Sequence, residues 1–308
     1  MKKYRLVTRS DMDGLVCAVL LNELEMIDDI KFVHPKDMQD GIIEINENDI
    51  ITNLPYVEKA HLVFDHHLSE TIRNKGKKEN YIINPDAPSA ARVVYDYFGG
   101  KDKFKEIDYN MIIAVDKADS AQFSLEDVLY PKGWDLLSFI MDARTGLGRF
   151  KDFKISNYNL MMDLIKYCKN HSIEEIVALP DVKERVDFFL ESQKSFKKQI
   201  EKCSKIYDNV LVVDFRNESV IYPGNRFLKY AIFPEINISI QVMWGLNKQN
   251  TVFAVGKSIF NKTSKVNIGE LMLKRNGGGH KAAGTCQINN DTAHDELIKL
   301  IKELKDLE

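Results

Sequence analysis

The chain has 308 residues, with 43 Lys and Arg against 46 Asp and Glu and a net charge of −3. This balance lacks the basic footprint with which proteins hold long duplex nucleic acid, although a local cluster can still bind a small phosphorylated ligand. No apolar run approaches the ~20 residues that cross a bilayer, and no signal-peptide segment precedes the first strand pattern. The four cysteines are scattered along the chain, which indicates free thiols. We therefore expect a cytoplasmic protein without membrane contact.

Residues 4–130 alternate between strand and helix patterns. Strands are predicted at Tyr4–Thr8, Ile30–Val33, Asp49–Thr52, His61–Phe64 and Tyr81–Ile83, and helices at Leu15–Glu25, Ser89–Phe98 and Ile107–Lys117. Near-continuous apolar strands joined by helices predict an α/β domain with a parallel sheet that helices cover on both faces. Ligands of such sheets bind beyond the carboxyl ends of the strands, which places Asp11, Asp13, Asn53 and Asp65 along one edge.

The second half of the chain changes pattern near residue 205. Residues 134–203 read as helical, and the charged stretch Val182–Lys202 predicts a long connecting helix. A new α/β pattern follows, with strands at Val210–Phe215, Ser219–Ile221, Ile236–Met243 and Thr251–Val255 and helices at Asn225–Ile232, Val266–Lys274 and Asp291–Leu307. We therefore predict a domain over residues 1–180, a connecting helix over 181–205 and a smaller domain over 206–308.

The first candidate site motif is Asp11-Met12-Asp13-Gly14, directly after the first predicted strand. Two aspartates spaced two apart in a turn can form a claw for a hard cation, and glycine lets the backbone bend tightly there. The alternative is a plain surface turn in which an aspartate caps the following helix.

A second motif, Asp65-His66-His67, follows the apolar run at 62–64. Carboxylate together with imidazole suits Mn, Fe or Zn better than Ca. The alternative is a pair of solvated histidines in a loop.

Two further aspartates, Asp116 and Asp119, leave a predicted helix and could each be a ligand or only a helix-end or salt-bridge residue. Ser89 and Arg92 could bind an anion at a helix N-terminus, although Ser89 also fits a simple N-cap. Two carboxylates held ~4 Å apart repel by about 4 kcal/mol at an effective dielectric near 20. Several carboxylates that meet at one sheet edge therefore require a cation.

The glycine run Gly277-Gly278-Gly279-His280 lies far from these motifs in the sequence. Consecutive glycines allow close approach of backbone amides to an anion, although such a run can also be only a flexible turn after a helix. Arg226 is a further candidate for a phosphate contact, with a capping or surface role as the alternative.

These motifs, in this order and spacing, resemble the DHH/DHHA1 phosphoesterase superfamily, which includes RecJ-like exonucleases, nanoRNA and pAp phosphatases, cyclic-dinucleotide phosphodiesterases and exopolyphosphatase-like proteins. The resemblance spans the whole chain and rests on Asp-x-Asp-Gly, Asp-His-His, Ala-Asp-Ser at 118–120 and Gly-Gly-Gly-His-Lys-Ala-Ala-Gly at 277–284. It implies an N-terminal parallel-sheet DHH domain and a C-terminal DHHA1 substrate-binding domain with a mixed sheet.

The resemblance also implies the site residues and the cofactor. One or two Mn²⁺ ions, or Mg²⁺ in their place, would be held by Asp11, Asp13, His66 and Asp119, with Asp65 supporting or ligating. His67 would bind phosphate or assist the leaving group, so that Asp65, His66 and His67 form the catalytic set. Arg9, Arg226 and the segment from Gly277 through Gly278 and Gly279 to His280 would bind the substrate.

Two positions depart from the family pattern. Arg9 stands where many members carry a histidine, and Asn53 stands where many carry a metal-bridging aspartate. One metal position is then weak, absent or completed by other residues such as His34 and Asp37. Arg9 could instead act as a phosphate fork.

The resemblance implies a metal-dependent phosphoesterase that works in an interdomain cleft. Its expected substrates are small or short: a single-stranded oligonucleotide, pAp, a cyclic dinucleotide or polyphosphate, with no long duplex as a partner. A homodimer is compatible with this expectation. The departures at Arg9 and Asn53 leave one alternative, a catalytically impaired protein that only binds a nucleotide or phosphate.

Overall fold

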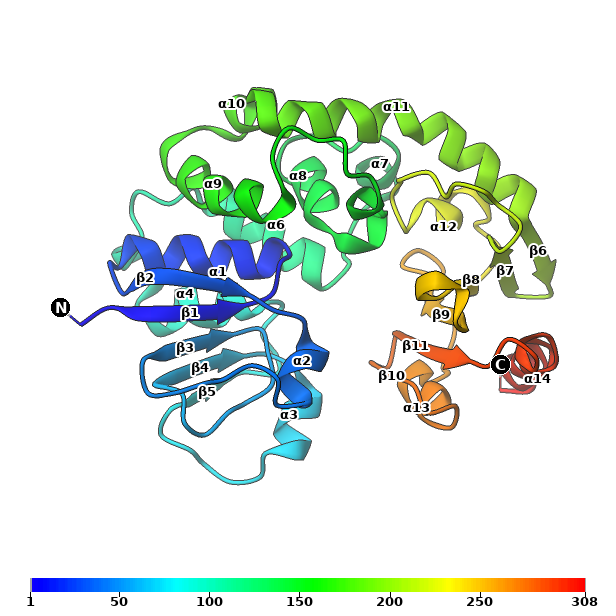
Figure 1. Cartoon of the computed structure of the whole chain (residues 1–308), viewed down its shortest axis with the longest axis horizontal. Helices are drawn as coiled ribbons and strands as arrows, with labels where there is room; N and C mark the ends of the chain where they lie inside the picture. The colour runs from blue at the N-terminus through cyan, green and yellow to red at the C-terminus, as the bar shows by residue number, and fades with distance from the viewer. Residues whose placement is uncertain (1, 308) are drawn as a thin grey trace. The chain divides into compact units, whose positions relative to one another are not determined.

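A computed structural model describes residues 2–307, without the side chains of Ser69 and Ile72. The chain forms two compact units (Figure 1). Unit 1 takes in the chain up to Phe123 together with Pro131–Phe189, and unit 2 takes in Ser124–Tyr130 together with the chain from Leu190 onward. The domain boundaries expected from the sequence, at 180–181 and 205–206, stay predictions.

Unit 1 is built on a five-stranded sheet whose strands all run parallel, as predicted. Its spatial order is β2-β1-β3-β4-β5, and its strands are β1 (Tyr4–Thr8), β2 (Ile27–Phe32), β3 (Asp49–Thr52), β4 (Leu62–Asp65) and β5 (Tyr81–Ile83). The strand order reverses between β1 and β3. Such a switch point opens a crevice at the carboxyl ends of the strands, where ligands of doubly wound sheets bind.

Both faces of this sheet are covered. Helix α1 (Met12–Glu23) is buried along most of its length because it contacts β1 and packs against α4 (Ala90–Tyr97), α6 (Tyr109–Asp119) and α9 (Asn157–Asn170). On the other face, a core formed by Val7, Ile51 and Val63 includes Met38 of the short helix α2 (Pro35–Gln39). The remaining helices of unit 1 are α3 (Leu68–Arg73), α5 (Gly100–Lys103), α8 (Gly133–Met141) and α10 (Ile173–Ala178). The short helix α7 (Leu125–Leu129) belongs to unit 2, and the long α11 (Pro180–Cys203) begins in unit 1 and ends in unit 2.

Unit 2 has a mixed sheet, as the resemblance implies, and this sheet has six strands. Its order is β10-β11-β9-β8-β7-β6, and only the β7–β8 pair is parallel. The strands are β6 (Ser204–Tyr207), β7 (Val210–Asp214), β8 (Ile238–Trp244), β9 (Thr251–Lys257), β10 (Gly278–Gly279) and β11 (Ala283–Ile288), with helices α12 (Leu228–Ile232), α13 (Ile268–Leu273) and α14 (Ala293–Asp306).

One predicted strand of unit 2 is wrong. Residues 219–221 form no strand. The side chain of Gln199 on α11 binds the backbone of this segment and of the residue after it, in place of a neighbouring strand. Its Nε2 donates to the carbonyl of Val220 at 2.7 Å, and its Oε1 accepts from the amide of Tyr222 at 3.1 Å. Strand β6, at one edge of the sheet, and strand β11, between β10 and β9, were not predicted. Strand β11 begins within the Ala-Ala-Gly segment that reads as a loop.

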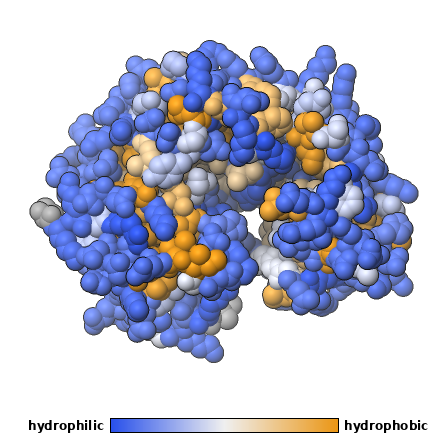
Figure 2. All heavy atoms as spheres, in the orientation of Figure 1, coloured by the Kyte–Doolittle hydropathy of each residue, from blue (hydrophilic) through white to orange (hydrophobic). Residues whose placement is uncertain are grey.

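The face drawn in Figure 2 is mainly hydrophilic, with a group of hydrophobic side chains on unit 1 near α2 and α3. Among residues 2–307, no helix combines the length and the apolar character that a bilayer crossing requires.

Candidate metal centre

Asp11 and Asp13, which follow β1, have different roles in the structure. Asp11 caps α1, because its Oδ1 accepts from the amide of Gly14 at 3.0 Å. Gly14 is needed for close approach rather than for a bend, since a Cβ there would lie 2.0 Å from the carbonyl oxygen of Arg9. Asp13 lies in the first turn of α1 and is only 2% exposed.

The N-terminus of α4 holds the Asp13 carboxylate. Its Oδ2 accepts from the amide of Ala90 at 2.9 Å and its Oδ1 from the amide of Ala91 at 2.7 Å. The anion at this helix N-terminus is therefore a side chain of the protein itself, a use that the sequence did not reveal. Ser89 is the N-cap of α4, as its alternative reading proposed, with its Oγ accepting from the amide of Arg92.

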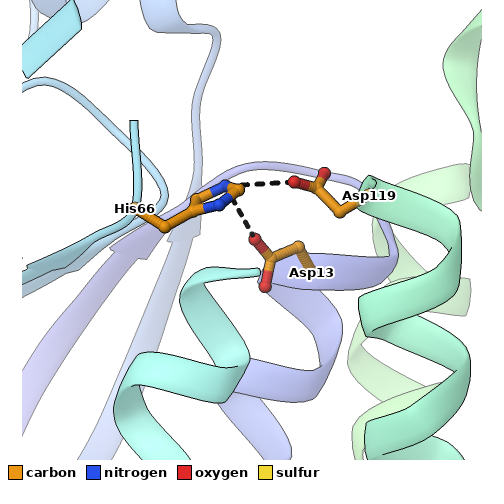
Figure 3. Close-up of side chains that lie close together, drawn as sticks. All are labelled: Asp13, His66 and Asp119. Carbon is orange, nitrogen blue, oxygen red and sulfur yellow. Dashed lines mark ion pairs between the residues drawn. The ribbon is translucent and has the colours of Figure 1, made fainter. Parts of the chain in front are cut away.

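His66 lies between two carboxylates (Figure 3). Its Nδ1 contacts the carbonyl oxygen of Ala87 at 3.1 Å, a geometry that places the proton on Nδ1. Its Nε2 then faces Asp119 Oδ2 at 3.0 Å and Asp13 Oδ2 at 4.0 Å. Anchoring one ring nitrogen through a backbone carbonyl while the other points at carboxylates is how proteins orient a metal-binding histidine.

Asp13, His66 and Asp119 fit a divalent cation. One ligand atom from each of the three residues lies within 4.8 Å of the other two. Within the described part of the chain, neither Asp11 nor Asp65 belongs to such a cluster of three or more ligand atoms. His66 Nε2 is buried, and within residues 2–307 it has no aligned hydrogen-bond partner despite the close Asp119 oxygen. A buried nitrogen that faces carboxylates without a directed hydrogen bond is what a shared cation would explain.

The pKa shifts of Asp13, His66 and Asp119 also indicate a site for positive charge. Burial first, and then the Asp119 carboxylate, raise the pKa of Asp13 to about 7. Burial alone would lower the pKa of His66, but its contact with Asp119 and the nearby Asp13 outweigh burial and raise that pKa to about 9. Burial likewise opposes ionisation of Asp119, yet His66 keeps the pKa of Asp119 below its ordinary value. The cluster therefore binds positive charge, which is a proton on His66 when no metal is present.

Asp65 and His67 form a separate pair beside this cluster. Asp65 is fully buried, and its Oδ1 lies 2.6 Å from His67 Nδ1 and accepts from the amide of His66 at 2.9 Å. The hydroxyl of Tyr81 contacts Oδ2 at 3.4 Å. The carboxylate of Asp65 thus orients the imidazole of His67. Its assignment as a metal ligand stays a prediction.

Arg9 and Asn53, the two positions that depart from the family pattern, both lie in unit 1. Arg9 Nε lies 3.0 Å from Asp11 Oδ2, so a guanidinium supplies positive charge beside that carboxylate. Burial raises the pKa of Asp11, and Arg9 partly offsets this effect. Asn53 is 1% exposed with φ at 56°, and neither polar atom of its side chain has a partner among the described residues. A buried carboxamide without a protein partner is a group whose hydrogen bonds a water or an ion could complete.

Asp116 is structural. Its carboxylate accepts from Ser89 Oγ at 2.7 Å and from Arg92 Nε at 2.9 Å, which ties α6 to α4. Of the two alternatives for this residue, the structure therefore favours the salt bridge. Asp119, three residues on, is the carboxylate that reaches His66.

The glycine run lies in unit 2, where the β10–β11 hairpin needs two of its three glycines for packing. A Cβ on Gly277 would lie 2.2 Å from the carbonyl oxygen of Thr285, and one on Gly279 would lie 2.3 Å from that of Ala283. A Cβ on Gly278 would meet open space. The amide of His280 donates to the Ala283 carbonyl at 2.7 Å.

Arg226 is also in unit 2, with its guanidinium 4.1 Å from the centre of the Phe227 ring. The part that Arg226, the three glycines and His280 would play in substrate binding stays a prediction.

Comparison with known proteins places these features in a family. Neither the family models nor the curated proteins searched gave a match. Among solved structures, the chain is similar to one described as the pGpG-specific phosphodiesterase PggH from Vibrio cholerae, at 57% identity and a TM-score of 0.85 over 99% of this chain and 100% of that one.

More distant structures share only the fold. RecJ from Thermus thermophilus, described in complex with Mn²⁺, aligns over all of this chain and 53% of its own length at 12% identity and a TM-score of 0.56. CDC45 from Entamoeba histolytica aligns over 99% of this chain and 96% of its own at 9% identity and a TM-score of 0.53. From the 57% identity over the full length, with the motif order and the two-unit fold, we conclude that the chain belongs to the DHH/DHHA1 phosphoesterase superfamily and is a DHH-type phosphoesterase.

Proposed function

We propose that this enzyme hydrolyses a short 5′-phosphorylated dinucleotide of the pGpG type with a divalent cation, Mn²⁺ or Mg²⁺, at Asp13, His66 and Asp119. The observation that supports the metal most directly is the convergence of these three ligand atoms within 4.8 Å. The substrate class is supported by the full-length similarity to a pGpG-specific phosphodiesterase. That similarity does not support the alternative of a catalytically impaired protein.

When bound, a divalent cation supplies a Lewis acid for the phosphoryl oxygens and lowers the pKa of water toward neutrality. Backbone groups of the protein hold the residues that would bind this cation in place before substrate arrives. The amides of Ala90 and Ala91 fix Asp13, and the carbonyl of Ala87 fixes the ring of His66. This preorganisation favours the charge distribution of the transition state over that of the ground state.

His67 is the residue that we assign to the leaving group. Hydrolysis breaks the bond between phosphorus and the 3′-oxygen, water supplies the new oxygen on phosphorus, and the departing 3′-oxygen gains a proton. Because Asp65 holds Nδ1 of His67 at 2.6 Å, Nε2 of the ring is the atom that can deliver this proton. Arg9 carries donors beyond the Nε that contacts Asp11, and these suit a phosphate oxygen.

A substrate panel tests the proposal. Purified protein with Mn²⁺ or Mg²⁺ is incubated with pGpG, pApA, pAp, cyclic di-GMP, longer single strands and polyphosphate, and the products are separated by chromatography. We expect two GMP per pGpG, loss of turnover with chelator, and a fall in kcat of at least 100-fold in Asp119→Asn. Asp102→Asn, which alters an exposed carboxylate on α5, is the matched control. The proposal fails if pGpG is not cleaved, or if Asp119→Asn cleaves it at the wild-type rate.

A further inference from the structure

Unit 1 contains a cavity of about 590 Å³ beside the metal centre. Its walls come from the loop after β1 at 9–11, from the end of β2 and the turn into α2 at 31–37 with Ile43, and from residues 142–144. Asp11 lines the cavity and caps helix α1, two residues before the proposed metal ligand Asp13. The cavity therefore adjoins the metal centre, and its volume falls in the range of pockets that enclose small ligands.

The cavity is lined by both cationic and acidic side chains, unlike a site that binds only phosphate. Its lining has three cations, Arg9, Lys31 and Arg144, and three carboxylates, Asp11, Asp37 and Asp142. Two of the carboxylates are paired within the protein. Arg9 Nε lies 3.0 Å from Asp11, and Arg144 Nε lies 2.7 Å from Asp142. A ligand for this lining needs hydrogen-bond donors as well as acceptors.

Asp37 is the carboxylate that remains. It lies in α2 and lines the cavity, and no hydrogen bond or ion pair to its side chain is found within residues 2–307. An unpaired carboxylate accepts from paired N–H groups of a ligand, and the bond is strong because the acceptor is charged. Phe32 and Ile43 are apolar residues of the same lining.

Guanine has the matching chemistry. Its N1–H and N2–H₂ groups are adjacent donors for a carboxylate, and its O6 and N7 are acceptors for Arg or Lys. Adenine has an acceptor at N1 and no amino group at C2, so the same carboxylate would disfavour it. Flat bases also stack on aromatic side chains.

We propose that this cavity binds one guanine of the substrate, with the Asp37 carboxylate accepting from N1–H and N2–H₂ and the base against Phe32. Arg144 and Lys31 supply donors for O6 and N7. The inference rests on the proposed function for the identity of the substrate and adds the residue that selects guanine. Asp37 acts in specificity and not in bond breaking.

The test compares pGpG with pApA in wild-type protein, Asp37→Asn and the control Asp40→Asn. Asp40 ends the same helix but is exposed and pairs with Lys36. For Asp37→Asn we expect a rise in KM for pGpG of at least tenfold, with kcat and the pApA constants within twofold of wild type. Asp40→Asn should match wild type. Calorimetric titration with GMP and AMP should show the same loss for GMP only, and circular dichroism confirms that each variant is folded.

The outcomes separate this inference from the proposed function. If pGpG is cleaved but Asp37→Asn leaves the preference for guanine unchanged, or weakens both dinucleotides equally, the guanine site is refuted and the proposed function stands. If no dinucleotide is cleaved but GMP binding still depends on Asp37, the proposed function is refuted and the site stands.

Discussion

Removal of divalent metal should make the stability of unit 1 fall as pH rises from 5 to 8. The pKa of Asp13 is raised from 3.8 to about 7 in the fold, so ionisation of this group opposes folding increasingly between those values. The pKa of His66 is raised from 6.5 to about 9, so its stabilisation is complete below 6.5 and is lost as pH approaches 9. The two effects have the same sign, and the lowered pKa of Asp119 acts only below this window.

Between pH 5 and 8, each of these shifts alone corresponds to about 2–3 kcal/mol of unfolding free energy. Because Asp13 and His66 share one interaction, their contributions do not add, and we expect a total fall of about 2–3 kcal/mol. Mn²⁺ supplies the missing charge at pH 8, where it stabilises the fold by about 2.7 kcal/mol at 100 times its dissociation constant. At pH 5 protons compete for the same ligands, so the metal stabilises less.

Urea unfolding measures these quantities. A Trp244→Phe background leaves Trp134, which is buried in unit 1, as the fluorescent reporter of that unit. Curves are recorded at pH 5 and 8 with chelator or Mn²⁺. Asp119→Asn should reduce the part of the pH dependence that comes from His66, because His66 loses its nearest carboxylate, and keep the part that burial of Asp13 causes. The variant should also lose most of the stabilisation by Mn²⁺, because the metal loses a ligand.

Equal stability of the chelated protein at pH 5 and 8 would refute the electrostatic argument for the cluster. Stabilisation of Asp119→Asn by Mn²⁺ to the same extent as wild type would place the cation elsewhere. The control Asp102→Asn should keep both the pH dependence and the effect of Mn²⁺.

Three further predictions follow from individual contacts. His67→Gln should lower kcat for pGpG by about 10²–10⁴-fold, because the leaving group loses its proton donor. KM and the urea midpoint should stay near wild type. A normal kcat in steady-state assays would exclude a role of His67 with the leaving group. Asn53→Asp should tighten Mn²⁺ binding at least tenfold in calorimetry and lower the stability of the chelated protein at pH 8, whereas unchanged affinity would mean that this buried position does not face the cation. Gly277→Ala should lose about 1–3 kcal/mol of unfolding free energy, because its Cβ would lie 2.2 Å from the Thr285 carbonyl oxygen. Gly278→Ala should unfold like wild type, because its Cβ would meet open space. An equal loss in both variants would contradict this packing argument.

Much of the fold could be predicted because the pattern of buried strands is local. The predicted bounds of β1, β3 and β5 match the structure residue for residue, and the long helix near 182–202 extends over Pro180–Cys203. The strand at Ser219–Ile221 was wrong because a side chain distant in sequence, Gln199, satisfies its backbone. No local pattern contains that information.

In the metal centre too, some features could be predicted from the sequence and others could not. Asp13, His66 and Asp119 were predicted as ligands, and the structure brings their side chains together. The groups that hold them were not predicted, since the carbonyl of Ala87 and the amides of Ala90 and Ala91 carry no side-chain signature. The only local hint was the predicted helix start at Ser89, for which the sequence left both a bound anion and a simple N-cap open.

The sequence by itself determined the alternation of strands and helices and the placement of acidic and imidazole groups at strand ends, because both depend on the order of residues along the chain. Only the tertiary structure decided which of those groups share a charge. It pairs Asp11 with Arg9 and Asp65 with His67, and it leaves Asp13, Asp119 and His66 facing one another. The physical reason is that pKa shifts and metal affinity depend on distances of a few ångströms between residues far apart in sequence.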